Sequence, residues 1–304
     1  MNILVLGGNG FIGSHIVDSL LEAGHSVRVF DRISEAYREP LHNVEYHFGN
    51  FDDQFLLAKA LQGIDAVVHL ISTSVPSTSN LDPASDVSSN LISTIELFEL
   101  MRKQNISRIL FMSSGGTVYG NPTMSPIPED HPLDPISSYG IVKVAIEKYL
   151  FMYQQLYGFN PIILRASNPY GPRQGNAGLQ GLIGTFLSRM LAKKPLVVWG
   201  SGEVIRDYLH IEDLARLSVK AVGSTETGVF NAGSGEGFSI NQIIATLNDV
   251  VGYAADVKYE KNRDFDVKKV VLDNSKAMTV FDWKADTGLL KGVQSQMGWL
   301  KSLK

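Results

Sequence analysis

A tyrosine and a lysine four residues apart, Tyr139 and Lys143 in "SSYGIVK", are the pair most capable of chemistry. On a helix, this spacing puts both side chains on one face. A phenol has a reference pKa of about 10 and is a poor base at neutral pH, but an ammonium within roughly 4–6 Å stabilises the phenolate and lowers that pKa. The pair therefore predicts a general base beside a cofactor, although most helical Tyr/Lys pairs are merely solvated.

A glycine-rich stretch, "GGNGFIG", supplies a second candidate site near the start of the chain. Gly7, Gly10 and Gly13 lie between an apolar run and a helical pattern, with Phe11 and Ile12 between them. A tight turn without Cβ atoms lets the backbone approach a pyrophosphate, whose charge the free N–H groups at the helix start bind. These five residues are the predicted dinucleotide contacts; a turn that serves only helix packing is the alternative.

An acidic residue supports this interpretation of the glycines. Asp31 lies eighteen positions beyond Gly13, at the end of the second apolar run. Its carboxylate would accept hydrogen bonds from the adenosine ribose and repel a 2′-phosphate, which favours NAD over NADP. The neighbouring Arg32 weakens that preference and is counted among the cofactor contacts.

Short β-rich runs alternate with helical patterns through the first half of the chain. Strands are predicted at 2–7, 26–31, 65–70 and 108–114, and helices at 11–25, around 53–62 and 85–104, and after Pro135. This alternation predicts an α/β fold, a Rossmann-type doubly wound parallel sheet that binds ligands at the carboxyl ends of its strands.

A change of pattern at about residue 167 predicts a second domain. Gly and Pro are frequent in "NPYGPRQGNAGLQG" and "GSGEV", as is typical of loops. A helix is expected near 179–193. We predict an NAD-binding domain over 1–166 and a smaller C-terminal α/β substrate-binding domain over 167–304, with 207–233 returning to the first.

Composition narrows the functional classes. The 304 residues include no cysteine and carry a net charge of −4, so there is no disulfide or thiolate and no bulk attraction to nucleic acid. No apolar stretch approaches the roughly 20 residues that span a bilayer. The first residues lack the basic region of an export signal. We expect a cytoplasmic protein with no metal site, no nucleic-acid partner and no membrane span.

Taken together, "GGNGFIG", Asp31, "SSGGTVYG", "YGIVK", "LRASNPYGPRQ" and "GSGEVIRDYLHIEDLA" resemble the extended short-chain dehydrogenase/reductase family, in its nucleotide-sugar epimerase branch. The resemblance implies that Tyr139 removes the proton of a sugar 4-hydroxyl while NAD⁺ takes hydride from C4, after which the 4-keto sugar rotates and is reduced on its other face. It also implies that Lys143 holds the nicotinamide ribose. Asn168, Arg206 and Arg263 map onto the family's diphosphate contacts, and a homodimer is the usual assembly.

One stretch departs from the family pattern. Four residues before the tyrosine of "VYG" the family carries Ser or Thr, whose hydroxyl bonds the reacting sugar oxygen, and here that position is Gly115. Ser114, after a backbone bulge, or Thr117 is expected to stand in, with an ordered water as a third possibility. Gly116 and Thr117 also replace the Asp-Glu pair of the dehydratases, which disfavours that chemistry.

Substrate choice rests on Val270, seven residues beyond Arg263, where a small residue in the family admits N-acetylhexosamines; an ordinary strand residue is the alternative. We therefore expect a 4-epimerase of UDP-glucose/UDP-galactose or of UDP-N-acetylglucosamine/UDP-N-acetylgalactosamine. An epimerase or reductase acting on a GDP- or dTDP-sugar, a lipid-diphosphate-linked substrate, and a non-catalytic NAD-binding sensor or scaffold are the alternatives.

Overall fold

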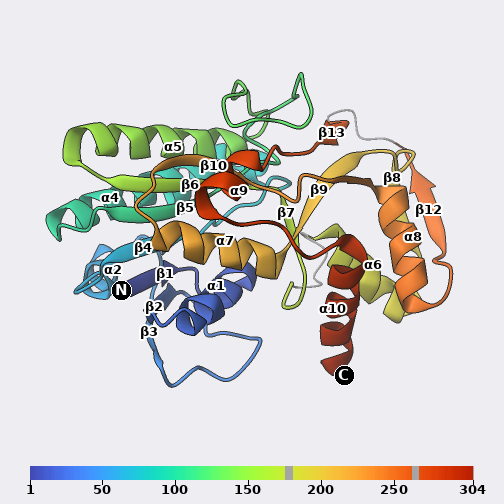
Figure 1. Cartoon of the computed structure of the whole chain (residues 1–304), viewed down its shortest axis with the longest axis horizontal. Coiled ribbons are helices and arrows are strands. Elements are labelled where there is room, and N and C mark those ends of the chain that lie inside the picture. Colours follow the sequence, from blue (N-terminus) through green and yellow to red (C-terminus); the bar gives the residue numbers. More distant parts are fainter. Residues whose placement is uncertain (175–180, 262–266, 304) are drawn as a thin grey trace.

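The computed structural model describes residues 1–174, 181–261 and 267–303. Its centre is a parallel sheet of seven strands (Figure 1). In spatial order these are β10 (Gly228–Ala232), β6 (Asn160–Ala166), β5 (Arg108–Ser114), β4 (Ala66–His69), β1 (Asn2–Leu6), β2 (Ser26–Asp31) and β3 (Val44–Phe48). The predicted Rossmann-type doubly wound sheet is confirmed, because the strand order reverses between β1 and β4, where such sheets bind ligands.

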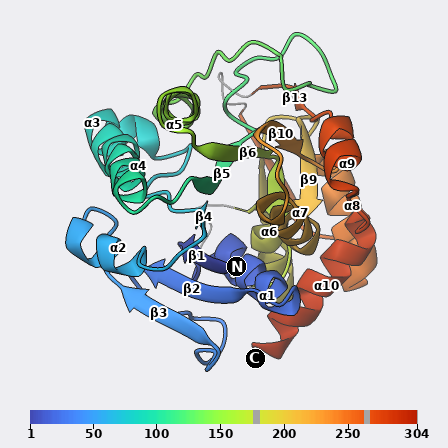
Figure 2. The ribbon, with the colours of Figure 1, turned by 60° about the vertical axis from the view of Figure 1, so that its left-hand side comes forward.

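Helices cover both faces of this sheet (Figure 2). One face is packed against α1 (Phe11–Glu22), α7 (Ile211–Gly223) and α9 (Ser275–Phe281). The other is packed against α2 (Gln54–Ala60), α4 (Ser93–Lys103) and α5 (Ser138–Tyr157). Double coverage explains why all but the first residue of β1 are buried, as is usual for parallel strands.

A smaller group of elements follows β6 in the chain. Strands β7 (Asn168–Tyr170), β9 (Ile205–His210), β11 (Gly237–Ser239) and β13 (Lys269–Val270) form one sheet, and β8 (Leu196–Trp199) pairs with β12 (Val257–Glu260). Helices α6 (Leu182–Leu191), α8 (Ile240–Val251) and α10 (Leu289–Ser302) pack on a core of their own. Both α7 and β10 lie with the seven-stranded sheet, so the chain crosses from one part to the other more than once.

Two details differ from the pattern expected from the sequence. Strands β3, β6 and β10 were not among the predicted strands. The segment predicted as one helix over 85–104 contains a short helix α3 (Pro83–Asp86), a π-helical segment η2 (Val87–Ile92) and then α4. A short 3₁₀ helix, η1 (Ser79–Leu81), precedes them.

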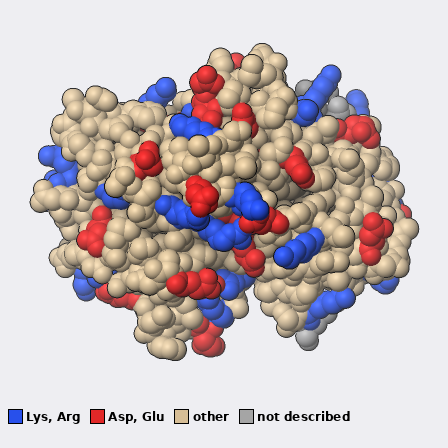
Figure 3. All heavy atoms as spheres, in the orientation of Figure 1, with Lys and Arg blue, Asp and Glu red and all other residues tan. Residues whose placement is uncertain are grey.

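No described helix has the length and apolar character needed to cross a membrane. In the orientation of Figure 1, acidic and basic side chains are interspersed over the visible face (Figure 3).

Candidate active site

The turn between β1 and α1 has the close packing that its glycines predict. Gly7 has φ +84°, a conformation that favours glycine, and its N–H donates to the Phe30 carbonyl at 2.9 Å. A Cβ atom at Gly13 would overlap the carbonyl oxygen of Gly7. Gly10 is the N-cap residue of α1, which begins at Phe11, and no described side chain caps the first N–H groups of this helix. A diphosphate would fit here, against the positive end of the helix dipole.

Asp31, at the end of β2, lies beside this turn. Its carboxylate accepts hydrogen bonds from the N–H of Asn9 at 3.1 Å and of Arg32 at 2.8 Å. Asn9 was not predicted from the sequence, although it is the polar residue within "GGNG". Its side-chain amide donates to the Ile33 carbonyl at 2.6 Å, while its buried Oδ1 atom has no hydrogen-bond partner among the described residues. The glycine turn, the Asp31 carboxylate and the unpaired Asn9 Oδ1 atom together fit the dinucleotide that the sequence predicts.

Tyr139 and Lys143 lie in the first turns of α5. The Lys143 ammonium donates to the Met112 carbonyl of β5 at 3.0 Å and lies 5.5 Å from the centroid of the Tyr139 ring. Burial lowers the pKa of Lys143 to about 8. Burial also raises the pKa of Tyr139 to about 12, with a further rise from the Asp86 carboxylate and a reduction from a hydrogen bond with Ser114. The expected lowering of the Tyr139 pKa is therefore wrong for the protein alone, because desolvation of the phenolate dominates.

Ser114 supplies a hydroxyl that bonds the Tyr139 phenol. It is the last residue of β5, which pairs with β6 in unbroken register up to Ser114 and Ala166. The bulge considered above is therefore not needed. A Cβ atom at Gly115 would point instead at Leu272 Cδ1, 2.5 Å away, and at the Arg165 carbonyl oxygen, 3.0 Å away. Position 115 thus faces packed protein, and Ser114 faces the phenol.

Thr117 follows in the turn after β5. Its N–H donates to the Ser114 carbonyl at 3.2 Å, and its buried hydroxyl has no hydrogen-bond partner in the described structure. The hydroxyl that bonds Tyr139 is that of Ser114.

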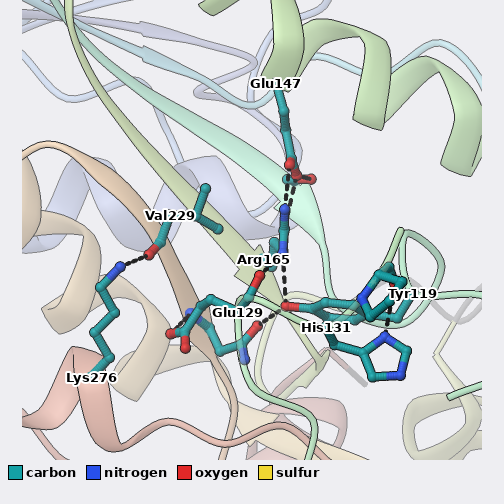
Figure 4. Close-up of polar contacts among 10 residues, drawn as sticks. Tyr119, Glu129, His131, Glu147, Arg165, Val229 and Lys276 are labelled. Carbon is teal, nitrogen blue, oxygen red and sulfur yellow. Dashed lines mark hydrogen bonds and ion pairs between the residues drawn. The ribbon is translucent and has the colours of Figure 1, made fainter. Parts of the chain in front are cut away.

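A buried ionic network connects the end of β5 to α5 and β6. Figure 4 shows the Arg165 guanidinium between the Glu147 carboxylate and the Tyr119 hydroxyl, at 2.7 and 3.0 Å. Glu147 also accepts a 2.5 Å hydrogen bond from Ser113, the neighbour of Ser114. Sequence reasoning missed this network, although Glu147 lies one helical turn beyond Lys143, a spacing that places it on the same face of α5.

The predicted substrate residues gather on the smaller sheet. Arg206 on β9 lies opposite Val270 on β13, and Asn168 on β7 donates to the Asp207 carbonyl of β9 at 2.9 Å. Val270 is buried in a cluster with Val118 of the turn that follows Ser114. Arg263 lies outside the described residues.

Asp207 is a further residue that sequence reasoning missed. Its buried carboxylate accepts hydrogen bonds from the N–H groups of Ser234 at 2.8 Å and Leu272 at 3.2 Å. Burial raises the pKa of Asp207, and these hydrogen bonds oppose the rise. Asp207 therefore holds the backbone of Leu272, the residue that a Cβ atom at Gly115 would contact.

Comparisons with known proteins show the family to which this fold belongs. The model of the NAD dependent epimerase/dehydratase family matches residues 3–233. A UDP-glucose 4-epimerase of Thermotoga maritima, solved with UDP-glucose, is 34% identical, with a TM-score of 0.95 and full coverage of both chains. A UDP-glucose 4-epimerase of Thermus thermophilus, solved with NAD, is 31% identical, with a TM-score of 0.93 and full coverage of both chains.

A third structure widens the range of sugars among the relatives. The UDP-N-acetylglucosamine 4-epimerase of Methanobrevibacter ruminantium M1, solved with UDP-N-acetylmuramic acid, is 29% identical, with a TM-score of 0.94. The match covers all of this chain and 99% of that one.

Proposed function

The chain belongs to the NAD dependent epimerase/dehydratase family, and from this premise we propose that it is an enzyme that interconverts the C4 epimers of a nucleotide sugar with NAD as cofactor. The substrates are UDP-glucose and UDP-galactose, or their N-acetylhexosamine counterparts. The observation that carries the proposal is the approach of Tyr139, Lys143 and Ser114 at the carboxyl end of β5.

We assign the cofactor to the seven-stranded part of the chain. Gly7, Gly10 and Gly13, with Phe11 and Ile12, would hold the pyrophosphate at the start of α1. Asp31, with Arg32 beside it, would hold the adenosine ribose. When bound, NAD⁺ supplies the hydride acceptor for sugar C4 and, in its reduced form, the donor that returns the hydride.

The chain's own groups then handle the proton. We assign Tyr139 as the base that takes the proton of the 4-hydroxyl and later returns it, and Ser114 as the hydroxyl that bridges the phenol and the sugar oxygen. Lys143, held on the Met112 carbonyl, stabilises the phenolate. Because burial alone raises the pKa of Tyr139, positive charge must act on the phenol before it serves as a base at neutral pH.

We assign the sugar nucleotide to the smaller part. This division follows the predicted domains, 1–166 and 167–304, with 207–233 returning to the first. The return of 207–233 is supported by α7 and β10, because both pack with the seven-stranded sheet. Asn168 and Arg206 on neighbouring strands would bind the diphosphate, together with Arg263, since guanidinium groups match phosphate oxygens. The family pattern and the modest size of Val270, which is buried beside Val118 and Leu272, are our basis for proposing room for a 2-acetamido group.

A homodimer and a cytoplasmic location belong to the same proposal. Apolar side chains on one face of α5 are exposed, with Ile141 at 54% and Leu156 at 62%, and Met152 lies between them. Their spacing of eleven and four residues keeps them on one stripe of the helix. Such a stripe is suited to pairing with a second copy, and sedimentation at micromolar concentration would test this.

The function is tested by supplying the purified protein with NAD⁺ and UDP-glucose or UDP-N-acetylglucosamine and resolving the C4 epimers by proton NMR. We expect conversion of at least one sugar, and none by Tyr139→Phe carrying the same amount of NAD. Lack of conversion by the wild-type protein would refute the proposal, and net consumption of reduced cofactor would identify a reductase instead.

A further inference from the structure

A buried carboxylate that no step above uses lies beside Tyr139. Asp86, the last residue of α3, is only 3% exposed. Its two oxygens accept three side-chain hydrogen bonds, from Ser74 at 2.6 Å, Asn90 at 2.8 Å and Ser138 at 2.6 Å. A buried carboxylate needs such partners, because its desolvation is otherwise unfavourable. Asp86 is therefore a fixed group in this part of the protein.

The bond from Ser138 connects Asp86 to the start of α5. Ser138 immediately precedes Tyr139, and its N–H donates to the side-chain oxygen of Asn80 at 2.8 Å. The Tyr139 N–H donates to the Ser79 hydroxyl at 3.1 Å. The first turn of α5 is thus held by three side chains from the segment 79–86, which lies alongside it (Figure 2).

The π-helical segment η2 fixes Asp86 from its other side. Asn90, in this segment, bonds Asp86 through its amide, and its own carbonyl accepts from the Thr94 hydroxyl at 2.5 Å. Thr94 in turn contacts His69 Nε2 at 3.0 Å, at the carboxyl end of β4. A connected row of polar groups therefore runs from the central sheet to the first turn of α5. Short π-helical segments are frequent at functional sites.

We propose that Asp86 is a positioning residue for Tyr139: through Ser138 it fixes the first turn of α5 and so directs the phenol toward Ser114 and Lys143. The inference rests on the proposed function, because it assumes that Tyr139 is the base. In this role Asp86 acts through Ser138 and Tyr139, with no contact of its own to the sugar or the cofactor required.

The charge of Asp86 also affects the pKa of Tyr139, and this effect can be measured separately from its positioning role. The carboxylate raises the pKa of Tyr139, and it also raises that of Lys143. Among the described residues, the other charged or titratable groups that act on the pair are Glu147, which raises the pKa of Lys143, and His69, which faces Lys143. Removal of the charge at 86 alone should therefore lower the pKa of the base, and the acid limb of the pH–rate profile should move to lower pH.

The test compares Asp86→Asn with Asp82→Asn. Both aspartates line the same cavity of about 290 Å³, but Asp82 is exposed and only caps α3, where it accepts the Ser85 N–H at 3.0 Å. Asparagine caps a helix as well as aspartate does. Epimerase kcat and KM are measured across pH for both variants and the wild type, with Tyr139→Phe as the inactive reference.

For Asp86→Asn we expect a plateau kcat at least tenfold lower, because misplacement of a reacting group by a fraction of an ångström is costly, with KM within about twofold. Its acid limb should lie at lower pH, while Asp82→Asn should match the wild type. A wild-type plateau in Asp86→Asn, or an equal loss in Asp82→Asn, would overturn the inference. An inactive wild type would instead refute the proposed function.

A second variant keeps the test decisive if Asp86→Asn does not fold. Ser138→Ala removes the one bond from Asp86 to α5 and leaves the charge in place. Its kcat should fall without movement of the acid limb. A wild-type kcat in Ser138→Ala would show that the bond does not position Tyr139.

Discussion

Replacement of Gly115 by serine, the residue type that the family pattern leads one to expect, should destabilise the protein. A Cβ atom there would lie 2.5 Å from Leu272 Cδ1 and 3.0 Å from the Arg165 carbonyl oxygen. Leu272 is fully buried and its N–H is held by Asp207, so it has little room to withdraw. Overpacking of this kind costs about 1–3 kcal/mol, and we expect about 2 kcal/mol because both a side chain and a backbone atom are in the way.

Trimming Leu272 should relieve that cost. Leu272→Ala alone should lower the free energy of unfolding by about 2–5 kcal/mol, because it leaves a cavity. In the double variant Gly115→Ser/Leu272→Ala, the free energy of unfolding should fall by at least about 1 kcal/mol less than the sum of the two single reductions. Gly116→Ser is the matched control, since the nearest atom to its Cβ is Ser114 Oγ at 4.0 Å. Urea unfolding without cofactor gives the free energies of unfolding of the wild type, the two single variants, the double variant and the control. Wild-type stability of Gly115→Ser, or additive losses, would refute the packing argument.

Three further predictions concern the site and its support. Ser114→Ala should lower kcat about tenfold to a hundredfold, since it removes a hydrogen bond to a charged phenolate, whereas Thr117→Val should lose less than Ser114→Ala; steady-state assays distinguish them. Glu147→Gln should reduce the free energy of unfolding by about 3–5 kcal/mol, because Arg165 keeps a buried charge without its counter-ion; a loss under about 1 kcal/mol in urea unfolding would contradict this. Burial lowers the pKa of His69 to about 3, so the folded protein keeps it neutral and the unfolded chain protonates it below about 6.5. Between pH 7.5 and 5 this residue should remove about 2 kcal/mol of stability, and His69→Gln should show a correspondingly weaker loss.

The sequence predicts those parts of the fold whose signal is local. β1 is a run of apolar residues that ends in a glycine turn, and α1 carries an apolar stripe, so both are evident before the structure is known. β3 is an edge strand with one buried residue in five, which gives no clear alternation. The π-helical segment depends on contacts of Asn90 and Thr94 with distant partners, which no local pattern encodes.

The sequence also predicts only those parts of the candidate site that depend on local spacing. The glycines and Asp31 belong to one strand–turn–helix unit, so their spacing alone predicts their arrangement. The choice of Ser114 over position 115 depends on what a Cβ atom at 115 would meet. That neighbour is Leu272, which lies far away in the sequence. The pKa of Tyr139 likewise follows from its burial and from Asp86, neither of which the Tyr/Lys spacing reveals.

The central claim is that the sugar is oxidised and re-reduced at C4 by a hydride that never leaves the enzyme. Incubation of the NAD-loaded protein with UDP-glucose deuterated at C4, followed by proton NMR and mass analysis of both epimers, tests it directly. The account predicts UDP-galactose that retains deuterium at C4, with none lost to water. Epimerisation with loss of the label, or no epimerisation of either UDP-glucose or UDP-N-acetylglucosamine by the NAD-loaded protein, would contradict it.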